Sequence, residues 1–521
     1  MYTISRTEKV FGILQLSSKN IYKTNNPTTI MKYFTPYMRF DHEFLVMTKK
    51  LLDLNDYYIV IHDVHFDEEK RKYIGTVLEY ICRVTEIPDT LNIPKLIAIC
   101  NWGGIGKIKK IMNDYNDFDL TPEREFFEGD IYSIDPEGCI DIDDALQYYY
   151  KEDKHYFIIH IADVSSYISS DSPLDIELSE RCESVYLNDI TIHMIPEEIS
   201  IKKCSLFEGE EKRAFSIVII VDNINEFKKD KIEIKFIKTK IKVKQNLSYD
   251  KAQKIINKKE DSNLLILYNF GKCIGNYYSN KDNYDTHIMV ANYMILANNL
   301  VADQLANYEG SLLRKHTGEN IECYLTDDKN LLNIYKNLFM DRAEYILNDF
   351  KKETKHFGLN LEKYTHFTSP IRRYADILVH RMLYDSIINR KINSNMKLEN
   401  LIRKINKYKK LYNDCETLSK IFNFNKDLLN KESILDFTGN IVSFDDNNIK
   451  VHLDDIDIVV TVNIIHNKLI NLYNIELDKD DFKIYSKDDK EIIILKLFQK
   501  VSIKIYRQIK NIKMFQCELI K

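Results

Sequence analysis

The stretch DIYSIDPEGCIDIDDAL, residues 130–146, decides how this chain is interpreted. A short apolar strand is predicted to deliver Asp135 into a Pro-Glu-Gly turn, and three further aspartates follow. Asp141 and Asp143 are two residues apart, so in extended chain they point to one side while Asp144 points to the other. Because the turn folds Asp135 back toward the other three, we expect four carboxylates to converge.

Carboxylates gathered in this way need a compensating cation. Two of them ~4 Å apart repel each other by roughly 1 to 4 kcal/mol, depending on the effective dielectric. Hard oxygen ligands favour Mg²⁺, with Mn²⁺ as a substitute, over Zn²⁺. Two such ions ~4 Å apart can activate a water and stabilise the leaving oxygen of a phosphodiester. A solvated acidic turn is the alternative, although the apolar flanks argue against it, and the offsets do not fit a calcium-binding EF-hand loop.

A second informative stretch is YTHFTSPIRRYADILVHRML, residues 364–383. Ser369 suits the N-cap of a helix and Pro370 suits its first position, so the pattern predicts a helix that begins here. The predicted apolar face repeats at helical spacing and consists of Ile371, Tyr374, Leu378 and Met382.

Two arginines then fall in the first turn of this predicted helix. The helix dipole disfavours cations there, so Arg372 and Arg373 make sense if a phosphate occupies the helix N-terminus. The alternative is a salt-bridged arginine with Asp376 as its partner.

Along the chain, strand patterns and helix patterns divide into blocks. Residues 1–95 read as short strands of a cold-shock-like or OB-like barrel, and residues 96–127 as a connector. Residues 128–433 have strands followed by helices, which is typical of an α+β domain. Residues 434–521 return to short strands and predict a second OB-type barrel. The predicted fold class is therefore an α+β central domain flanked by small all-β OB-type barrels.

Composition restricts the setting in which such a protein works. With 521 residues, 44% of them hydrophobic, the chain is long enough for several folded domains. Its formal net charge of −5 means that nucleic acid would have to bind a local basic surface. Nine cysteines without a C-x-x-C pair predict free thiols in a reducing compartment. Neither a signal peptide nor a membrane span is expected, so we predict a cytoplasmic or nuclear protein that is not secreted.

The segment IDPEGCIDIDDAL resembles the signature of the ribonuclease II (RNB) family, including its eukaryotic branch with the exosome exoribonuclease subunit. The resemblance implies that the four aspartates are the metal ligands of a catalytic site, namely Asp135, Asp141, Asp143 and Asp144. It further implies that Asp143 is the residue whose loss abolishes cleavage while RNA binding persists.

The other stretches extend this resemblance over most of the chain. In the family, the segment around 364–383 lies near the chemistry, and Arg372 matches an arginine that contacts the scissile region. Within SVYLNDITIHMIPEEIS, Tyr186 matches the aromatic residue that stacks on the 3′-terminal bases; without the family it would be interpreted as a core residue. The remaining RNA contacts that the resemblance implies are Ser369, Pro370, Arg373 and, within RAEYIL, Tyr345. His160, in HIADVSSYI, is interpreted as a core histidine in preference to a catalytic base.

Together these features predict a Mg²⁺-dependent, processive 3′→5′ exoribonuclease that releases nucleoside 5′-monophosphates from single-stranded RNA. The sequence departs from the family's pattern in two ways: we expect one clear cold-shock-like barrel at the N-terminus instead of two, and no endonuclease domain of the kind found on the exosome subunit. The resemblance implies subunits of an RNA-decay complex as candidate partners. The main alternative is a catalytically inactive RNA-binding or scaffold subunit, which loss of a cluster aspartate would mark. A metal-dependent phosphohydrolase acting on small phosphates is the second alternative, and it leaves the barrels without a purpose.

Overall fold

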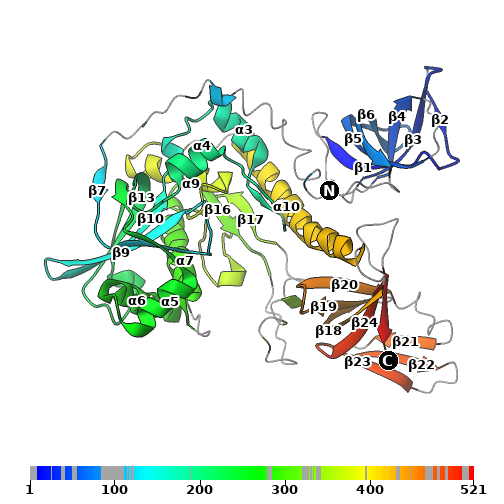
Figure 1. The fold of residues 1–521 in the computed structure, drawn as a ribbon. Helices are drawn as coiled ribbons and strands as arrows, with labels where there is room; N and C mark the ends of the chain where they lie inside the picture. Colours follow the sequence, from blue (N-terminus) through cyan, green and yellow to red (C-terminus); the bar gives the residue numbers. More distant parts are fainter. Residues whose placement is uncertain are drawn as a thin grey trace.

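The computed structural model shows a larger α+β part and two small β-rich parts, one formed by the N-terminal and one by the C-terminal end of the chain (Figure 1). The predicted fold class is confirmed by this arrangement. Most of the predicted connector, residues 96–127, lies outside the described residues. These are 9–24, 26–36, 42–49, 55–83, 95, 111–113, 115, 119, 123–188, 190–278, 284–318, 328, 331, 334–335, 342–392, 396–429, 434–445, 448–463, 473–477, 481–486, 491–506 and 516–520.

The N-terminal part is a closed six-stranded sheet in the order β1-β5-β6-β4-β3-β2, in which β1 pairs with both β5 and β3. Closure brings two backbones together at Gly12, where a Cβ would lie 2.3 Å from the carbonyl oxygen of Thr35. Only glycine fits such a close approach. The strands are β1 (Val10–Leu14), β2 (Tyr22–Lys23), β3 (Thr29–Pro36), β4 (Phe44–Lys49), β5 (Tyr57–Asp67) and β6 (Lys72–Arg83).

The central part is built on a seven-stranded sheet with the order β15-β8-β9-β10-β13-β14-β7. Its first strand, β7, pairs with β14, so residues that the sequence places at the end of the connector belong to this sheet. The strands are β7 (Glu125–Phe127), β8 (Ile131–Asp135), β9 (Asp144–Lys151), β10 (Lys154–Ala162), β13 (Glu211–Val221), β14 (Glu233–Lys242) and β15 (Gln245–Ser248).

Helices cover this sheet, and α5 and α6 lie below it in Figure 1. Side chains of Ser248, Asp261 and Asp285 cap the N-termini of α5, α6 and α7, which satisfies backbone N–H groups that a helix leaves free. The helices are α3 (Pro173–Arg181), α4 (Glu197–Ile199), α5 (Tyr249–Lys258), α6 (Ser262–Tyr277), α7 (Thr286–Leu305), α9 (Tyr374–Ile387) and α10 (Met396–Leu429). Short helical turns and strand pairs complete the part: η1 (Val164–Ser166), η2 (Ser200–Cys204), η3 (Lys229–Lys231), η4 (Phe357–Leu359), β11 (Val185–Tyr186), β12 (Thr191–Ile192), β16 (Leu312–Lys315) and β17 (Glu344–Leu347).

The C-terminal part begins where α10 ends, and Figure 1 shows this long helix running from the central part toward it. Phe424 of α10 belongs to the barrel core, and Lys420 pairs with Asp457 at 2.6 Å. The five-stranded sheet has the order β20-β19-β18-β24-β25, and its two edge strands also lie against each other, as in a barrel. Its strands are β18 (Ile434–Asp445), β19 (Asn448–Leu453), β20 (Ile458–Asn463), β24 (Lys500–Tyr506) and β25 (Gln516–Ile520), beside a three-stranded sheet of β21 (Tyr473–Leu477), β22 (Asp481–Ser486) and β23 (Glu491–Lys496).

Two further expectations can be compared with the described residues. The six described cysteines are all free thiols: Cys82, Cys139, Cys182, Cys204, Cys273 and Cys415. Within the described ranges, the helices are too short or too polar to cross a membrane.

Candidate active site

The aspartate stretch folds as the connection between two neighbouring antiparallel strands. Strand β8 ends at Asp135 and strand β9 begins at Asp144, and the two strands pair through Ile131–Gln147 and Tyr132–Leu146. The connecting turn passes through Gly138, whose φ of +79° suits glycine. A hairpin-like connection of this kind returns the chain on itself, which places Asp135 and Asp144 within electrostatic reach of each other.

Asp143 is buried and the other three aspartates of this cluster are half-buried, with too little positive charge to balance them. Burial, together with the charge of Asp141 and against a hydrogen bond from Ser133, raises the pKa of Asp135 to about 6. Burial also raises the pKa of Asp143 to about 8, against the opposing effect of Arg372. The pKa of Asp144 lies well above its ordinary value because of burial and the charges of Asp135 and Asp143. The site is therefore a concentration of negative charge in a poorly solvated place.

Asp143 is the carboxylate held most firmly by the protein. The residue is 6% exposed, and Oδ1 accepts a hydrogen bond of 2.9 Å from the backbone N–H of Ile371. Its Oδ2 lies 3.8 Å from Nε of Arg372. Its own carbonyl oxygen accepts a hydrogen bond of 2.8 Å from the N–H of Ala162, at the end of β10. These contacts join the aspartate stretch to the second informative stretch, more than 200 residues later.

The predicted start of the helix in that second stretch is wrong. Helix α9 begins at Tyr374, with Arg373 as its N-cap, and not at Ser369 and Pro370. The intervening backbone is engaged elsewhere: the carbonyl of Arg372 accepts from the N–H of Ser184, and the N–H of Tyr374 donates to Cys182. Because tertiary hydrogen bonds use these groups, the segment forms a turn and the argument from the helix dipole does not apply to the two arginines.

The two arginines have different environments. The side chain of Arg372 is 44% exposed, and its Nη2 donates to Oγ of Ser369 at 3.1 Å. Arg373 is largely buried, and its Nη2 donates to Oδ1 of Asp376 at 2.8 Å. The salt-bridged alternative therefore holds for Arg373, whereas Arg372 is open to a ligand. Ser369 and Pro370, which were also predicted as RNA contacts, are buried and form part of the packed turn.

Tyr186 stands at the edge of the cluster, on the short strand β11. It is 37% exposed, and its hydroxyl donates to Oδ2 of Asp141 at 2.8 Å. Burial and the charge of Asp141 raise its pKa well above the ordinary value for tyrosine. The structure thus places the predicted stacking residue beside the predicted metal ligands, with part of its side chain accessible.

Tyr345 does not fit its predicted role as an RNA contact. The residue is 2% exposed in strand β17, and its hydroxyl shares a hydrogen bond of 2.6 Å with Nδ1 of His366. Arg314 lies over its ring at 4.8 Å. A ring enclosed in this way has no face on which a base can stack, so Tyr345 supports the site as a core residue.

Sequence reasoning missed a second tyrosine of the site. Tyr249, the first residue of α5, has its pKa raised to about 12 by burial and by the charges of Asp144 and Asp135. It is brought there because β15, which precedes it, pairs with β8 so that Ser248 lies opposite Asp135. No motif surrounds Tyr249, and only this long-range strand pairing could have revealed it.

The donor set of the cluster suits a hard divalent cation. Its ligands are carboxylate oxygens, and Oδ2 of Asp135 is buried without a hydrogen-bond partner in the structure. A cation there would also relieve the burial of negative charge described above. In the part of the chain that the structure describes, three or more acidic, histidine or cysteine side chains do not come together as a ready-made metal set. The residues therefore fit Mg²⁺ by chemistry and charge, and the final ligand geometry requires side-chain adjustment.

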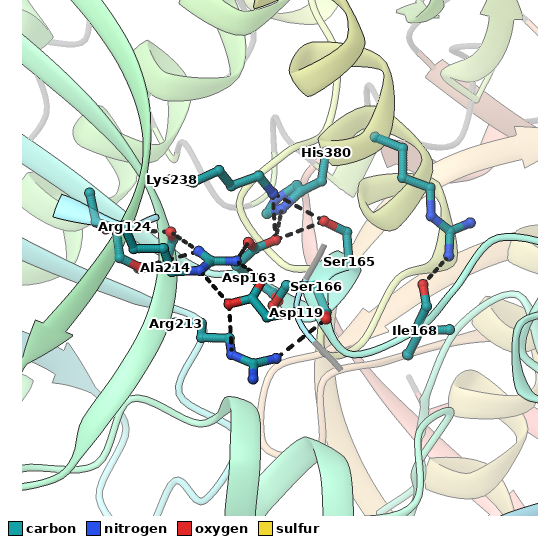
Figure 2. A network of polar contacts seen from close by, with 12 residues as sticks. Asp119, Arg124, Asp163, Ser165, Ser166, Ile168, Arg213, Ala214, Lys238 and His380 are labelled. Atoms are coloured by element: carbon teal, nitrogen blue, oxygen red, sulfur yellow. Dashed lines mark hydrogen bonds and ion pairs between the residues drawn. The ribbon is translucent and has the colours of Figure 1, made fainter. Parts of the chain in front are cut away.

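A second acidic centre forms around Asp163, and Figure 2 shows it. Asp163, which follows β10, is fully buried, and its carboxylate accepts from Lys238 at 2.7 Å and from Arg124 at 2.9 Å. These cations lower the pKa of Asp163 well below its usual range, although burial opposes them.

His160 lies on strand β10, three residues before Asp163, and is also buried. Its ring nitrogens form hydrogen bonds with Ser216 and Gln147, and burial lowers its pKa to about 3. The interpretation of His160 as a core residue is consistent with this environment.

A comparison with models of known families gives one match, the RNB domain, over residues 123–270 and 262–389. The matched span, 123–389, covers just over half of the chain and contains every residue of the site described above. The chain belongs to the RNB family. The prediction made from the IDPEGCIDIDDAL segment is thereby confirmed at the level of the family.

Curated RNB relatives match with moderate identity. A probable exosome complex exonuclease RRP44 from Caenorhabditis elegans is 33% identical over 327 residues, which is 49% of this chain and 34% of the relative. Ribonuclease R from Mycoplasmopsis pulmonis is 26% identical over 421 residues, 68% of this chain and 55% of the relative. The chain thus spans about a third to a half of the length of these relatives.

Solved structures of RNB-like proteins share the fold. Mycoplasma genitalium RNase R in complex with ribose-methylated single-stranded RNA aligns with a TM-score of 0.72 at 18% identity, covering 99% of this chain and 90% of the other. Yeast Ssd1, described as a pseudonuclease, aligns with a TM-score of 0.81 at 14% identity, covering 100% and 84%. A ribonuclease and a pseudonuclease are therefore both similar to this chain in fold. The fold alone does not tell whether this chain is an active enzyme, and the site residues have to be considered for that.

Proposed function

We propose that this chain is a processive 3′→5′ exoribonuclease that hydrolyses single-stranded RNA to nucleoside 5′-monophosphates. One observation carries the proposal: buried carboxylates with raised pKa values lie opposite an exposed arginine and beside a half-exposed tyrosine. Such a site can take a divalent cation, a phosphate and a base at the same time. The names of the RNB relatives, an exosome exonuclease and Ribonuclease R, support this choice of reaction.

Each group of the site has a distinct task in this proposal. Asp135, Asp141 and Asp144, with Asp143, would hold Mg²⁺ or Mn²⁺. The bound cation would supply Lewis acidity and lower the pKa of a water molecule. Arg372 neutralises charge on the scissile phosphate, because its guanidinium is exposed and lies next to Asp143.

Tyr186 offers a surface for the terminal base. Stacking of a base on an aromatic ring contributes about 1 to 3 kcal/mol and does not depend on sequence, as a non-specific nuclease requires. The ring stands beside Asp141, so a base seated there would have its adjoining phosphate within reach of the acidic cluster. This placement favours attack at the end of a strand over attack in its interior.

The barrels and partners belong to the same proposal. Small barrels of OB type commonly bind single strands, and here one precedes and one follows the central part. We propose that they guide RNA toward the cluster, and that other subunits of an intracellular RNA-decay complex bind this chain. The exosome name of one relative supports the second statement.

The main alternative is an inactive RNA-binding or scaffold protein. The similarity in fold to the pseudonuclease Ssd1 shows that a chain with this fold can lack nuclease activity. Against it stands the composition of the site. All four aspartates and Arg372 are present, and the raised pKa values of three of these carboxyls leave a charge imbalance that no described lysine or arginine resolves. A protein that only binds RNA gains nothing from concentrating negative charge where a phosphate must lie.

Incubation of the purified chain with 5′-labelled single-stranded RNA and Mg²⁺, with and without EDTA, tests the proposal. We expect a short labelled end product and free nucleoside 5′-monophosphates, and no cleavage with EDTA. RNA that stays intact while it still binds the protein would favour the scaffold. The variant Glu137→Gln, at an exposed acid of the same loop, should behave as the wild type and controls for a general loss of acidity.

A further inference from the structure

The hydroxyl of Tyr186 makes a contact that base stacking does not require. It donates a hydrogen bond of 2.8 Å to Oδ2 of Asp141, one of the proposed metal ligands. A phenylalanine at this position would present the same ring to a base. The hydroxyl therefore connects the proposed stacking surface to the proposed metal site, and the two can influence each other.

Both oxygens of Asp141 have donors from the protein. Oδ2 accepts from Tyr186, and Oδ1 accepts a weaker contact of 3.6 Å from Sγ of Cys139. Oδ2 of Asp135, by contrast, is buried and has no partner. A carboxylate whose lone pairs face protein donors is less available to a cation than one whose oxygen is free. This agrees with the finding that a ready-made set of metal ligands is not assembled among the described residues.

The backbone that carries Tyr186 is fixed from the other side. Its N–H lies 3.4 Å from Oε1 of Glu416, and the N–H of Asn188 donates to Oγ of Ser419 at 3.0 Å. Both partners are on α10, the helix that leads to the C-terminal barrel. With the backbone held, the ring responds to a ligand mainly through its side-chain torsions. A ring displacement of about 1 Å would lengthen the bond to Asp141 beyond hydrogen-bonding distance.

We propose that Tyr186 is a positioning residue whose hydroxyl holds Asp141 away from the divalent cation until a 3′-terminal base seats on the ring. The inference rests on the proposed function. Seating of the base moves the ring, frees Oδ2 of Asp141 and raises the affinity of the site for the cation. By thermodynamic linkage, the cation raises the affinity for the RNA end by the same factor. Hydrolysis would thus be confined to correctly seated ends.

Titration of Mn²⁺ into the full chain, followed by electron paramagnetic resonance of the free ion, tests this coupling. The titration is made with and without a single-stranded RNA whose last linkage is a hydrolysis-resistant methylphosphonate. In the wild type we expect the RNA to tighten Mn²⁺ binding about three- to tenfold, which is less than the full strength of a hydrogen bond to a charged group because Tyr186 is partly exposed. In Tyr186→Phe, Mn²⁺ should bind correspondingly tighter without RNA, and RNA should no longer change its affinity.

Two further variants separate this effect from others. Cys139→Ala removes the weaker donor to Asp141 and should change the Mn²⁺ affinity less than twofold. The length of the end product should be unchanged in Tyr186→Phe, which keeps the ring, and longer in Tyr186→Ala, which loses it. Equal Mn²⁺ affinities of Tyr186→Phe and the wild type, with and without RNA, would overturn the coupling but leave the nuclease intact. A wild type that binds no Mn²⁺ would overturn the coupling together with the proposed metal site.

Discussion

Two acidic centres of this protein, one around Asp143 and one around Asp163, differ in how their charge is balanced. Asp163 is fully buried, yet contacts with Lys238 and Arg124 keep its pKa well below the usual range. Asp143 is almost as buried, and its pKa is raised to about 8. A backbone hydrogen bond of 2.8 Å, from the N–H of Ala162 to the carbonyl of Asp143, joins the two segments.

The two centres therefore differ in whether the protein itself completes them. A buried carboxylate with close cations and several hydrogen bonds is complete, and it stabilises the packing of the elements around it. A group of carboxylates in which burial raises the pKa values and one partly exposed arginine is the nearby cation is incomplete, and it lowers its charge by taking up protons or a cation. Burial alone therefore does not distinguish a candidate functional acid from a structural one, whereas the balance of nearby charges does.

The largest expected effect separates the two centres by activity. Asp143→Asn should lower the rate of RNA hydrolysis at least about a thousandfold, as for loss of a central electrostatic group, while the affinity for RNA is retained. Because the wild-type carboxyl is buried with a raised pKa, the variant should be no less stable than the wild type at pH 8. Single-turnover cleavage, filter binding and thermal unfolding measure the three quantities. Rapid degradation by this variant would contradict the assignment of the site.

For Asp163 we expect the opposite of the result for Asp143, namely a large loss of stability on substitution. Asp163→Asn leaves the buried charge of Lys238 without a carboxylate and removes one of the two carboxylates that pair with Arg124, which should lower the free energy of unfolding by about 3 to 5 kcal/mol. Asp153→Asn, at an exposed turn, should change it by less than about 0.5 kcal/mol. Urea unfolding of both variants gives the comparison, and equal stabilities would show that the Asp163 network is not a structural centre.

Arg372 and Arg373 test the same distinction between a group of the candidate site and a structural group, with smaller expected effects. Arg372→Ala should reduce kcat about a hundredfold with little loss of stability, because this guanidinium is exposed beside the cluster. Arg373→Ala removes the partner of buried Asp376 and should lower the free energy of unfolding by about 3 kcal/mol. If both variants lost activity while their free energies of unfolding were unchanged, the assignment of the Arg373–Asp376 ion pair as a structural contact would be wrong.

The smallest expected effect concerns pH and the cation. The folded-state pKa values of Asp135 and Asp143, about 6 and about 8, lie above those of an unfolded chain, so the folded protein binds more protons between pH 4 and 8. Without divalent ions, stability should therefore fall as the pH rises from 5 to 8. Added Mg²⁺ should raise Tm by a few degrees at pH 8 and by less at pH 5, because it competes with protons for the carboxyls. Calorimetry at both pH values checks this, and an equal effect of Mg²⁺ at pH 5 and 8 would speak against binding at the cluster.

Much of the site could be predicted from residue type and spacing. Asp135 and Asp144 converge because the turn around Gly138 joins two antiparallel strands, which the local sequence already indicated. The start of α9 could not be predicted in this way. Ser369 and Pro370 have the local preferences of a helix N-terminus, but hydrogen bonds to Ser184 and Asp143 hold the segment as a turn.

The sequence by itself determined the fold class, the family and the presence of four carboxylates in one short stretch, because these depend on local pattern and residue chemistry. Only the tertiary structure decided which charges are balanced. It exposed Arg372 and buried Arg373, enclosed the ring of Tyr345, and brought Tyr249 to the cluster. The physical reason is that desolvation and pairing depend on contacts between residues far apart in the chain, which spacing within a segment does not encode.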